Sequence, residues 1–351
     1  MLVSLRALTE MRRVHEIIEL TKESQKFLEW VSQMDSSLET LDEVPHMEGM
    51  KQYIAKNLRL LKAINYQGGH FKSGFGYHLL SFLRLRGQSA NSRGQWFTSD
   101  TIHMGILLLR KELQREIGAT TFLLPPLQWD TDSEMGRIMT SEEKMQEALG
   151  QDSGENLLRL LSNQRDPIVV ADATELERAV VYTVVNKGGN HWLGVEACLR
   201  TRNVLVYDPA DLYGARTGDG SEKYFSKLRS LLELVLKEKD VRPPPLKYNE
   251  WNTAWAHGGQ QIILGDSANC GVYAIEWIRH RIMSAVKHRV MAEKKEGAKF
   301  LRQKMRETAM NTFDTQFLNK VRLRIAVFAL KEMRHLQKPW SYDALISQST
   351  K

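Results

Sequence analysis

The pattern of apolar and polar positions predicts three adjacent β-strands near the middle of the chain. Residues Ala179–Val185 are rich in β-branched side chains, and His191–Cys198 alternates toward Val195 and Ala197. A third run, Asn203–Tyr207, follows after four residues, which is short enough for a hairpin turn. We therefore expect the second and third strands to pair antiparallel.

The predicted hairpin brings together a histidine and an aspartate. His191 opens the second strand, and Asp208 directly follows the third. Antiparallel pairing puts both at the same end of the hairpin, within about one residue of register. A carboxylate there can accept the imidazole N–H, which fixes the tautomer and favours the protonated ring. The two residues are candidates for a catalytic base and the group that orients it.

A helical pattern follows a cysteine later in the chain. Residues Val272–Met283 have the periodicity of a helix, and Cys270 and Gly271 stand directly before them. The apolar stripe consists of Val272, Ile275, Ile278 and Ile282. The positive end of a helix and a neighbouring imidazolium both stabilise a thiolate. Gly271 leaves the backbone open, so a peptide carbonyl could reach the sulfur and the N–H donors of the helix start.

The order His, Asp, Cys separates this arrangement from other nucleophile classes. A papain-type enzyme has its cysteine before its histidine. Ser267 stands in a loop similar to that of serine proteases, but His191 and Asp208 on one hairpin do not suit that architecture. A single histidine or cysteine usually has a structural role, and we expect such a role for Cys198 at its strand end.

Composition agrees with an intracellular thiol enzyme. The chain has 351 residues, 42% of them hydrophobic, and its two cysteines form no disulfide framework. No paired cysteine spacing or His-Glu-x-x-His pattern is present, so we expect no metal and no cofactor. The first twenty residues lack a signal-peptide core, and there is no apolar run of about 18 residues. We expect cytoplasm or nucleus; an effector secreted into a host cytosol would look the same.

These motifs resemble those of the ubiquitin-like-protein proteases of clan CE, which include the SUMO-specific (sentrin-specific) proteases. The family pattern is His-Trp, an Asp after a short strand pair, and a Cys-Gly that opens a helix. His191-Trp192, Asp208 and Cys270-Gly271 match it. The resemblance implies an α+β fold: a papain-like or adenain-like cysteine protease core with a mixed β-sheet and a helix-borne cysteine.

A second match lies upstream and concerns substrate binding. Trp96, within Gln95–Ile102, resembles the family's Trp-Leu-x-Asp motif, although Asp100 falls one residue later than that pattern. The resemblance implies that Trp96 and Trp192 wall a narrow slot for the Gly-Gly tail of a ubiquitin-like modifier. Only glycine is thin enough for such a slot, so tail selection is steric. Asp100 is a further candidate for contact with the modifier.

The implied activity is cleavage after Gly-Gly of a modifier such as SUMO, ubiquitin or a Nedd-type protein, through an acyl-enzyme on Cys270. The family's oxyanion glutamine stands six residues before the cysteine, where this chain has Leu264. Either a longer loop brings in Gln261, or backbone N–H groups at Cys270 and Gly271 do most of the work. A catalytically weak or dead modifier-binding module and a clan CE acetyltransferase are the alternatives.

Charge and patterning predict extensions on both sides of the core. We expect a helical extension over residues 1–90, including an amphipathic segment Leu5–Val31 and a second one at Met47–Ile64, then a catalytic domain over 91–286. Residues 287–351 form a basic helical extension, with a net charge of +9 between Lys287 and Lys338. Solvated helix faces, an acidic partner, an anionic membrane and nucleic acid all fit this charge, and the last would make the protein a basic nucleic-acid-binding protein.

Two connecting segments have compositions of their own. Gly68–Gly76 is rich in glycine but lacks the ending of a phosphate-binding loop, so we expect a flexible connection. Gln128–Glu155 is polar and acidic, and we expect surface helix and loop there; its acidic residues are candidates for contact with the modifier.

Overall fold

The computed structural model describes two compact units. The described residues are 5–33, 69–71, 76–77, 79–88, 94–113, 121–124, 126–129, 179–187, 191–210, 252–256, 258, 261, 266, 268–293 and 315–334. Unit 1 consists of Met1–Met104 and Asp314–Lys351, and unit 2 consists of Gly105–Phe313. The helix predicted at Met47–Ile64 lies outside the described residues.

Unit 2 is built on a mixed sheet whose described strands follow the order β3-β5-β6-β7-β8, with β4 also paired to β5. The strands are β3 (Thr121–Leu123), β4 (Leu127–Trp129), β5 (Val180–Lys187), β6 (His191–Cys198), β7 (Asn203–Tyr207) and β8 (Asn252–Trp255). β5, β6 and β7 pair antiparallel, as predicted for the last two, whereas β3, β4 and β8 run parallel to their neighbours. The three strands predicted from the sequence are confirmed.

The parallel strands have no counterpart among the sequence predictions. β3, β4 and β8 are only three or four residues long, too short to show an alternating pattern. β4 contains Gln128 and Trp129, so the prediction of surface helix and loop is wrong for these two residues. The rest of that acidic segment lies outside the described residues. Pairing with β5, far away in the sequence, makes β4 a strand.

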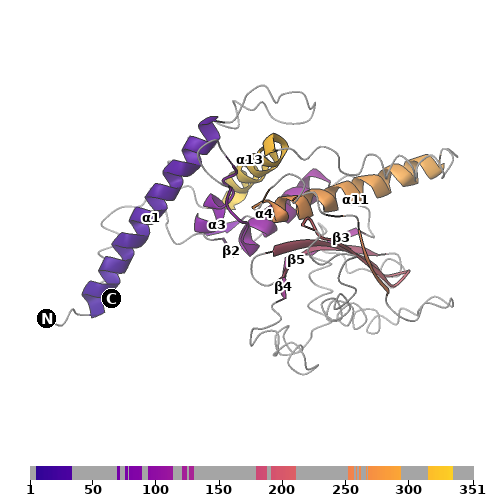
Figure 1. The fold of residues 1–351 in the computed structure, drawn as a ribbon, viewed down its shortest axis with the longest axis horizontal. Coiled ribbons are helices and arrows are strands. Elements are labelled where there is room, and N and C mark those ends of the chain that lie inside the picture. Colours follow the sequence, from indigo (N-terminus) through magenta and orange to yellow (C-terminus); the bar gives the residue numbers. More distant parts are fainter. Residues whose placement is uncertain are drawn as a thin grey trace. The chain divides into compact units, whose positions relative to one another are not determined.

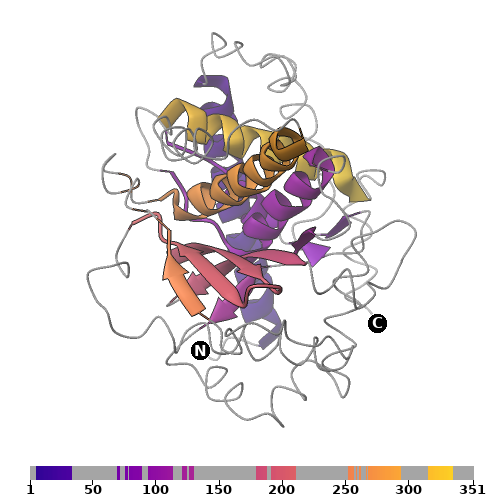
Figure 2. The ribbon, with the colours of Figure 1, turned by 90° about the vertical axis from the view of Figure 1, so that its right-hand side faces the viewer.

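Helix α11 (Cys270–Glu293) packs on β6 and β5 in unit 2, and Figure 2 shows it lying along one face of the sheet. The predicted apolar stripe of this helix is buried. A Cβ atom at Gly194 would lie 2.7 Å from Cε3 of Trp277, so a glycine allows this close approach of helix and strand. The Trp277 ring stacks on Tyr207, with centroids 5.3 Å apart and an interplanar angle of 7°.

A partly buried ion pair also fixes α11 on the sheet. Nε and Nη2 of Arg281 donate to the two carboxylate oxygens of Glu196, each at 2.7 Å. This fork geometry specifies direction as well as distance. Glu196 lies on β6, opposite Tyr182 of β5. The pair therefore sets the register of α11 along the strand that begins with His191.

Unit 1 contains the first and last described helices. Its helices are α1 (Leu5–Gln33), α3 (Leu79–Leu83) and α13 (Thr315–Glu332), and the boundary with unit 2 falls within α4 (Ser99–Glu112). A small antiparallel sheet has the order β2-β1-β9, with bounds Gly76–Tyr77, Gly69–Phe71 and Met333–Arg334. The flexible connection predicted for Gly68–Gly76 is therefore wrong for β1 and β2, because pairing with the distant β9 orders them.

The predicted N-terminal helix is confirmed as α1 (Figure 1), but its apolar positions differ in burial. Phe27 is fully buried and packs on Phe82 and Trp30, with ring centroids 5.4 and 5.3 Å away. Leu8 and Met11 are 50% and 65% exposed. A packing face is thus right for Phe27 and wrong for these two residues.

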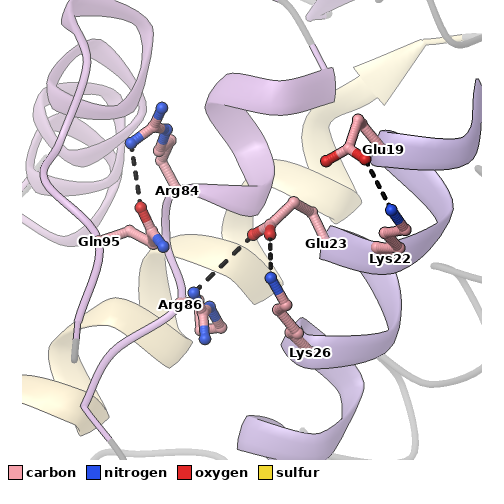
Figure 3. A network of polar contacts seen from close by, with 7 residues as sticks. All are labelled: Glu19, Lys22, Glu23, Lys26, Arg84, Arg86 and Gln95. Carbon is pink, nitrogen blue, oxygen red and sulfur yellow. Dashed lines mark hydrogen bonds and ion pairs between the residues drawn. The ribbon is translucent and has the colours of Figure 1, made fainter. Parts of the chain in front are cut away.

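An ion pair connects α1 with the segment that precedes α4 (Figure 3). The Glu23 carboxylate accepts a hydrogen bond from Lys26 at 2.7 Å and lies 3.8 Å from the guanidinium of Arg86. Arg84 donates to the side-chain oxygen of Gln95 at 3.0 Å. Since Arg86 is buried, its charge is compensated within unit 1 rather than by solvent.

Arg322 of α13 stabilises the same segment from inside unit 1. Its guanidinium is fully buried and donates to the backbone oxygens of Arg84, Arg86 and Gln95 at 3.1, 3.1 and 2.8 Å. It also lies over the Phe97 ring, 4.5 Å from the centroid. Lys320 is buried as well. Solvated helix faces are therefore the wrong description for Lys320 and Arg322.

Candidate active site

The histidine and aspartate of the predicted pair are in contact. Nε2–H of His191 donates to Oδ1 of Asp208 at 2.8 Å, and both side chains are buried. Gly194 pairs with Tyr207, so the register continues with Asp208 opposite Leu193. Leu193 is two residues from His191, whereas the sequence predicted an offset of about one residue. Side chains two positions apart on a strand share a face, so this diagonal contact is within reach.

The turn after β7 holds the Asp208 carboxylate in place. Its Oδ1 also accepts the backbone N–H of Ala210 at 2.9 Å. Behind it, Gly258 leaves no room for a side chain, because a Cβ atom there would overlap the backbone carbonyl of Asp208. Sequence reasoning missed Gly258, whose only signal was a glycine pair after an unpredicted strand.

Cys270 is the first residue of α11 and is 3% exposed. Its side chain is hydrogen-bonded to that of His191. Because Nε2 of the imidazole is bonded to Asp208, Nδ1 is the nitrogen left for the sulfur. The N–H of Tyr273 donates to Asn269 O at 3.0 Å, so the N–H groups of Cys270 and Gly271 precede the first intrahelical bond. The predicted position of the cysteine at a helix start is confirmed.

The two partners of His191 change its titration. Burial alone lowers the pKa of His191, but the hydrogen bonds with Asp208 and Cys270, and the charges of both groups, outweigh burial and raise the pKa to about 9. The imidazolium is therefore the favoured form at neutral pH. A positive ring beside the sulfur is the environment in which a thiolate forms.

Lys187 is a charged neighbour of this pair that the sequence analysis missed. It ends β5 directly opposite His191 in the register. Partial burial lowers its pKa to about 8, against the attraction of the Asp208 carboxylate. Lys187 and the imidazolium are thus two cations that share one carboxylate.

Gln261, the predicted oxyanion donor, lies beside the turn that carries the aspartate. Its backbone N–H donates to Pro209 O at 2.9 Å, one residue after Asp208, and the residue is 5% exposed. Its side-chain oxygen is buried and has no hydrogen-bond partner among the residues that the structure describes. Leu264, at the family's usual glutamine position, lies outside the described residues.

The predicted substrate-binding residues fall in different parts of the chain. Gly271 is the second residue of α11, and Trp192 follows His191 on β6 and is 2% exposed. Trp96 is 47% exposed and, like Asp100 in the first turn of α4, belongs to unit 1. The structure brings His191, Asp208 and Cys270 together, whereas the roles of both tryptophans and Asp100 stay predictions.

Comparison with known families decides the class of this site. Residues 163–320 match the Ulp1 protease family, C-terminal catalytic domain. This region belongs to the Ulp1 family of clan CE. The Ulp1-family region includes His191, Asp208, Gln261 and Cys270, and the predicted α+β cysteine-peptidase fold and clan are confirmed.

Several solved structures resemble the chain at low identity. The C-terminal Ulp1 protease domain in complex with Smt3, the yeast ortholog of SUMO, is 11% identical, with a TM-score of 0.45 over 80% of this chain and 95% of that one. The Ulp1-like SUMO protease catalytic domain of Chaetomium thermophilum is 14% identical, with a TM-score of 0.42 over 84% and 93%. ChlaDub1 of Chlamydia trachomatis is 13% identical, with a TM-score of 0.34 over 73% and 99%. No curated protein matches the chain.

Among the helices that the structure describes, none is both long and apolar enough to cross a membrane.

Proposed function

We propose that the chain is a thiol protease that cleaves after the Gly-Gly tail of a ubiquitin-like modifier. The observation that carries this proposal is the double contact of His191, which is hydrogen-bonded to Asp208 at 2.8 Å and to the side chain of Cys270. A base fixed between a carboxylate and a thiol on a helix start is the arrangement that nucleophilic catalysis requires. Membership of the Ulp1 family supports the same class of substrate.

The reaction follows from the groups in contact. In the imidazolium–thiolate form of the pair the Cys270 proton is on His191, and the thiolate attacks the carbonyl carbon of the terminal glycine. The C–N bond breaks, the imidazolium protonates the leaving amine, and a thioester remains on Cys270. His191 then takes a proton from water, and the hydroxide releases the tail as a carboxylate and restores the thiol. Asp208 holds the ring in one orientation throughout.

The oxyanion of each tetrahedral intermediate requires hydrogen-bond donors. The N–H groups at the start of α11 supply one set. Gln261 is the proposed side-chain donor, supported by its burial and by its backbone bond to Pro209, next to Asp208. Its spacing from Cys270 is nine residues instead of six, so this role requires a longer connection than the family pattern has.

The substrate part of the proposal rests on the family. The resemblance assigns contact with the Gly-Gly tail to Trp96 and Trp192, and contact with the folded modifier to Asp100. Trp96 supports this role because almost half of its surface is open to a ligand. Trp192 is 2% exposed and directly follows His191 on β6. SUMO, ubiquitin and Nedd-type proteins are the candidate modifiers.

The test is covalent labelling by modifiers that carry a C-terminal thiol-reactive group. SUMO, ubiquitin and Nedd-type probes are each incubated with the wild type, with Cys270→Ala, with His191→Ala, and with Cys198→Ala as the matched thiol control. We expect one probe to form an adduct with the wild type and with Cys198→Ala but not with Cys270→Ala. The His191→Ala variant should label far more slowly.

The alternatives give different results in the same experiment. A binding module without catalysis would retain a modifier without forming an adduct. An acetyltransferase would label with none of the three probes but would transfer acetyl from acetyl-coenzyme A to Cys270. Either result in a folded sample would overturn the protease proposal.

A further inference from the structure

An aspartate outside the His191–Asp208–Cys270 site connects the residues around it. The backbone N–H of Asp266 donates to Gln261 O at 2.9 Å. Its carboxylate oxygens each accept one bond, Oδ1 from the N–H of Ala268 at 2.8 Å and Oδ2 from Nδ2 of Asn269 at 2.6 Å. Asp266 thus bonds on one side to the residue proposed as oxyanion donor and on the other to the segment that enters α11.

The second of these partners stands directly before the nucleophile. Asn269 is 2% exposed, and its carbonyl accepts the first intrahelical bond, from Tyr273 at 3.0 Å. Asn269 is therefore the N-cap residue of α11, and Cys270 is the first residue of the helix. Whatever fixes the Asn269 side chain and backbone also fixes the direction in which the Cys270 Cα–Cβ bond leaves the chain.

The Asp266 carboxylate determines the orientation of the Asn269 amide. A carboxylate only accepts hydrogen bonds, so the amide must present its nitrogen to Oδ2 and turn its oxygen away. Without that acceptor, a buried amide nitrogen would have to rotate to find another partner. The turn closed by Ala268 N–H would open at the same time, because both bonds end on one carboxylate.

An aspartate that only closes a surface turn would use one oxygen and touch only its own backbone neighbours. Asp266 uses both oxygens, and the shorter bond reaches a side chain that is almost fully buried. Its backbone also bonds to Gln261, five residues earlier in the chain. These contacts join the two parts of the site that must stay in register during acyl transfer, the sulfur and its proposed amide donor.

We propose that Asp266 is a positioning residue of the thiol site, which sets the rate of acyl transfer to Cys270 by orienting Asn269 and the start of α11. The inference rests on the proposed function, since it assumes acyl transfer at Cys270. Asp266 itself touches no reacting atom. Its removal should slow acylation and leave modifier binding unchanged, because the modifier contacts proposed above involve other residues.

The experiment measures acylation with a substrate that needs no modifier. Cys270 attacks p-nitrophenyl acetate, the ester C–O bond breaks, p-nitrophenolate leaves, and an acetyl thioester forms on the sulfur. The burst of p-nitrophenolate reports this step, and Cys270→Ala shows how much of the burst depends on that thiol. Modifier cleavage is measured in parallel, so that kcat and KM are separated.

Four variants distinguish positioning from general loss of structure. Asp266→Ala removes both acceptors, and Asp266→Asn keeps the bond to Ala268 but faces the Asn269 nitrogen with another donor. The exchange Asp266→Asn with Asn269→Asp restores a donor–acceptor pair and keeps the charge of the site. Glu112→Ala is the matched control, because Glu112 is a carboxylate of unit 2 that pairs with Arg279 of α11 at 3.5 Å.

We expect Asp266→Ala and Asp266→Asn to slow the burst about 10- to 100-fold, the loss typical of a misplacement of about 1 Å. The exchanged pair should recover to within about threefold of the wild type, and Glu112→Ala should change the rate less than about twofold. The KM for a cleaved modifier should stay within about twofold in all four. If Asp266→Ala does not fold, the comparison of Asp266→Asn with the exchanged pair decides.

Three results would overturn the inference: a wild-type burst rate in Asp266→Ala, an exchanged pair as slow as Asp266→Asn, or a wild type without any Cys270-dependent burst. A wild type that acylates with the ester but cleaves no modifier contradicts the proposed protease function alone. In that case the burst rates of the variants still test the role of Asp266.

Discussion

The backbone of Gly258 lies directly against the main-chain carbonyl of Asp208, so that no side chain fits between them. The Asp208 turn is thereby supported from behind while its carboxylate bonds to His191 in front. We predict that Gly258→Ala displaces this turn, lowers the free energy of unfolding by about 1 to 3 kcal/mol and reduces the rate of Cys270 acylation. Urea unfolding and the ester burst measure the two effects.

Gly194→Ala is the matched control for that prediction. Its added methyl would press on the Trp277 ring, at 2.7 Å, and not on the Asp208 turn. Both variants should lose stability, but Gly258→Ala should lose more activity at conditions where both are fully folded. Equal activities in the two folded variants would show that the support of Asp208 by Gly258 has no catalytic consequence.

Removing the charge of Asp208 should move the pH dependence of the site. The hydrogen bonds with Asp208 and Cys270 raise the pKa of His191 to about 9. In the wild type we expect kcat/KM to fall above about pH 9, where His191 loses its proton; this fall is the alkaline limb of the pH profile. In Asp208→Asn it should move down toward the ordinary 6.5, and kcat should fall at least about 100-fold. A limb that stays near pH 9 would mean that Asp208 does not hold the proton on His191.

The same raised pKa also links stability to pH. A histidine whose pKa is higher in the folded than in the unfolded chain stabilises the fold fully below pH 6.5, and this contribution is lost as pH rises toward 9. The wild type should lose up to about 3 kcal/mol of unfolding free energy across that interval relative to His191→Ala. Urea titrations at a series of pH values measure the difference. Parallel curves for the two proteins would contradict the assignment.

Lys187 should have the opposite effect on the alkaline limb. Its cation is attracted to the Asp208 carboxylate and so competes with the His191 imidazolium. Because the pKa of Lys187 is about 8, only a small part of its charge remains near pH 9, so in Lys187→Met we expect the pKa of His191 to rise and the limb to shift upward by about 0.3 pH unit or less. Arg200→Met, which removes an exposed cation from the turn between β6 and β7, is the control and should leave the limb in place. A downward shift in Lys187→Met would refute the competition.

Arg322→Met tests the buried cation of unit 1. The change leaves the backbone oxygens of Arg84, Arg86 and Gln95 without their guanidinium donor. Arg86 O keeps the backbone N–H of Gln95 as a donor, whereas the part-buried oxygens of Arg84 and Gln95 lose the guanidinium, so the unfolding free energy of unit 1 should fall by about 2 kcal/mol or more. Lys331→Met, at an exposed position of the same helix, should cost less than about 0.5 kcal/mol. Comparable losses in both variants would contradict the proposed clamp.

The sequence patterns were informative where the structure is local. β5, β6 and β7 follow one another with short connections, so alternation and turn length were enough to predict the hairpin that carries His191 and Asp208. The start of α11 was also predictable, because Cys270 stands directly before a periodic run. These elements supply the base, its orienting group and the nucleophile.

The remaining features depend on contacts between distant segments. β8 pairs parallel with β7 and has no pattern of its own, and Gly258 acquires its importance only because the chain returns to Asp208. Arg322 looked like part of a solvated basic helix, but its partners are carbonyls more than 200 positions earlier. A pattern along the chain contains no information on such partners. Asp266 was also missed, because apolar periodicity contains no information on hydrogen bonds made by a side chain within a turn.

Unit 1 is built from two separate segments of the chain, so it cannot be completed until the second segment has been translated. Its two segments, residues 1–104 and 314–351, are separated by about 200 residues of unit 2. At about 5 to 20 residues per second, a ribosome needs roughly 10 to 40 s to translate that interval. Until α13 emerges, the carbonyls of Arg84, Arg86 and Gln95 lack the guanidinium of Arg322. The N-terminal part of unit 1 therefore remains incompletely packed, and accessible to chaperones, until α13 has been synthesised.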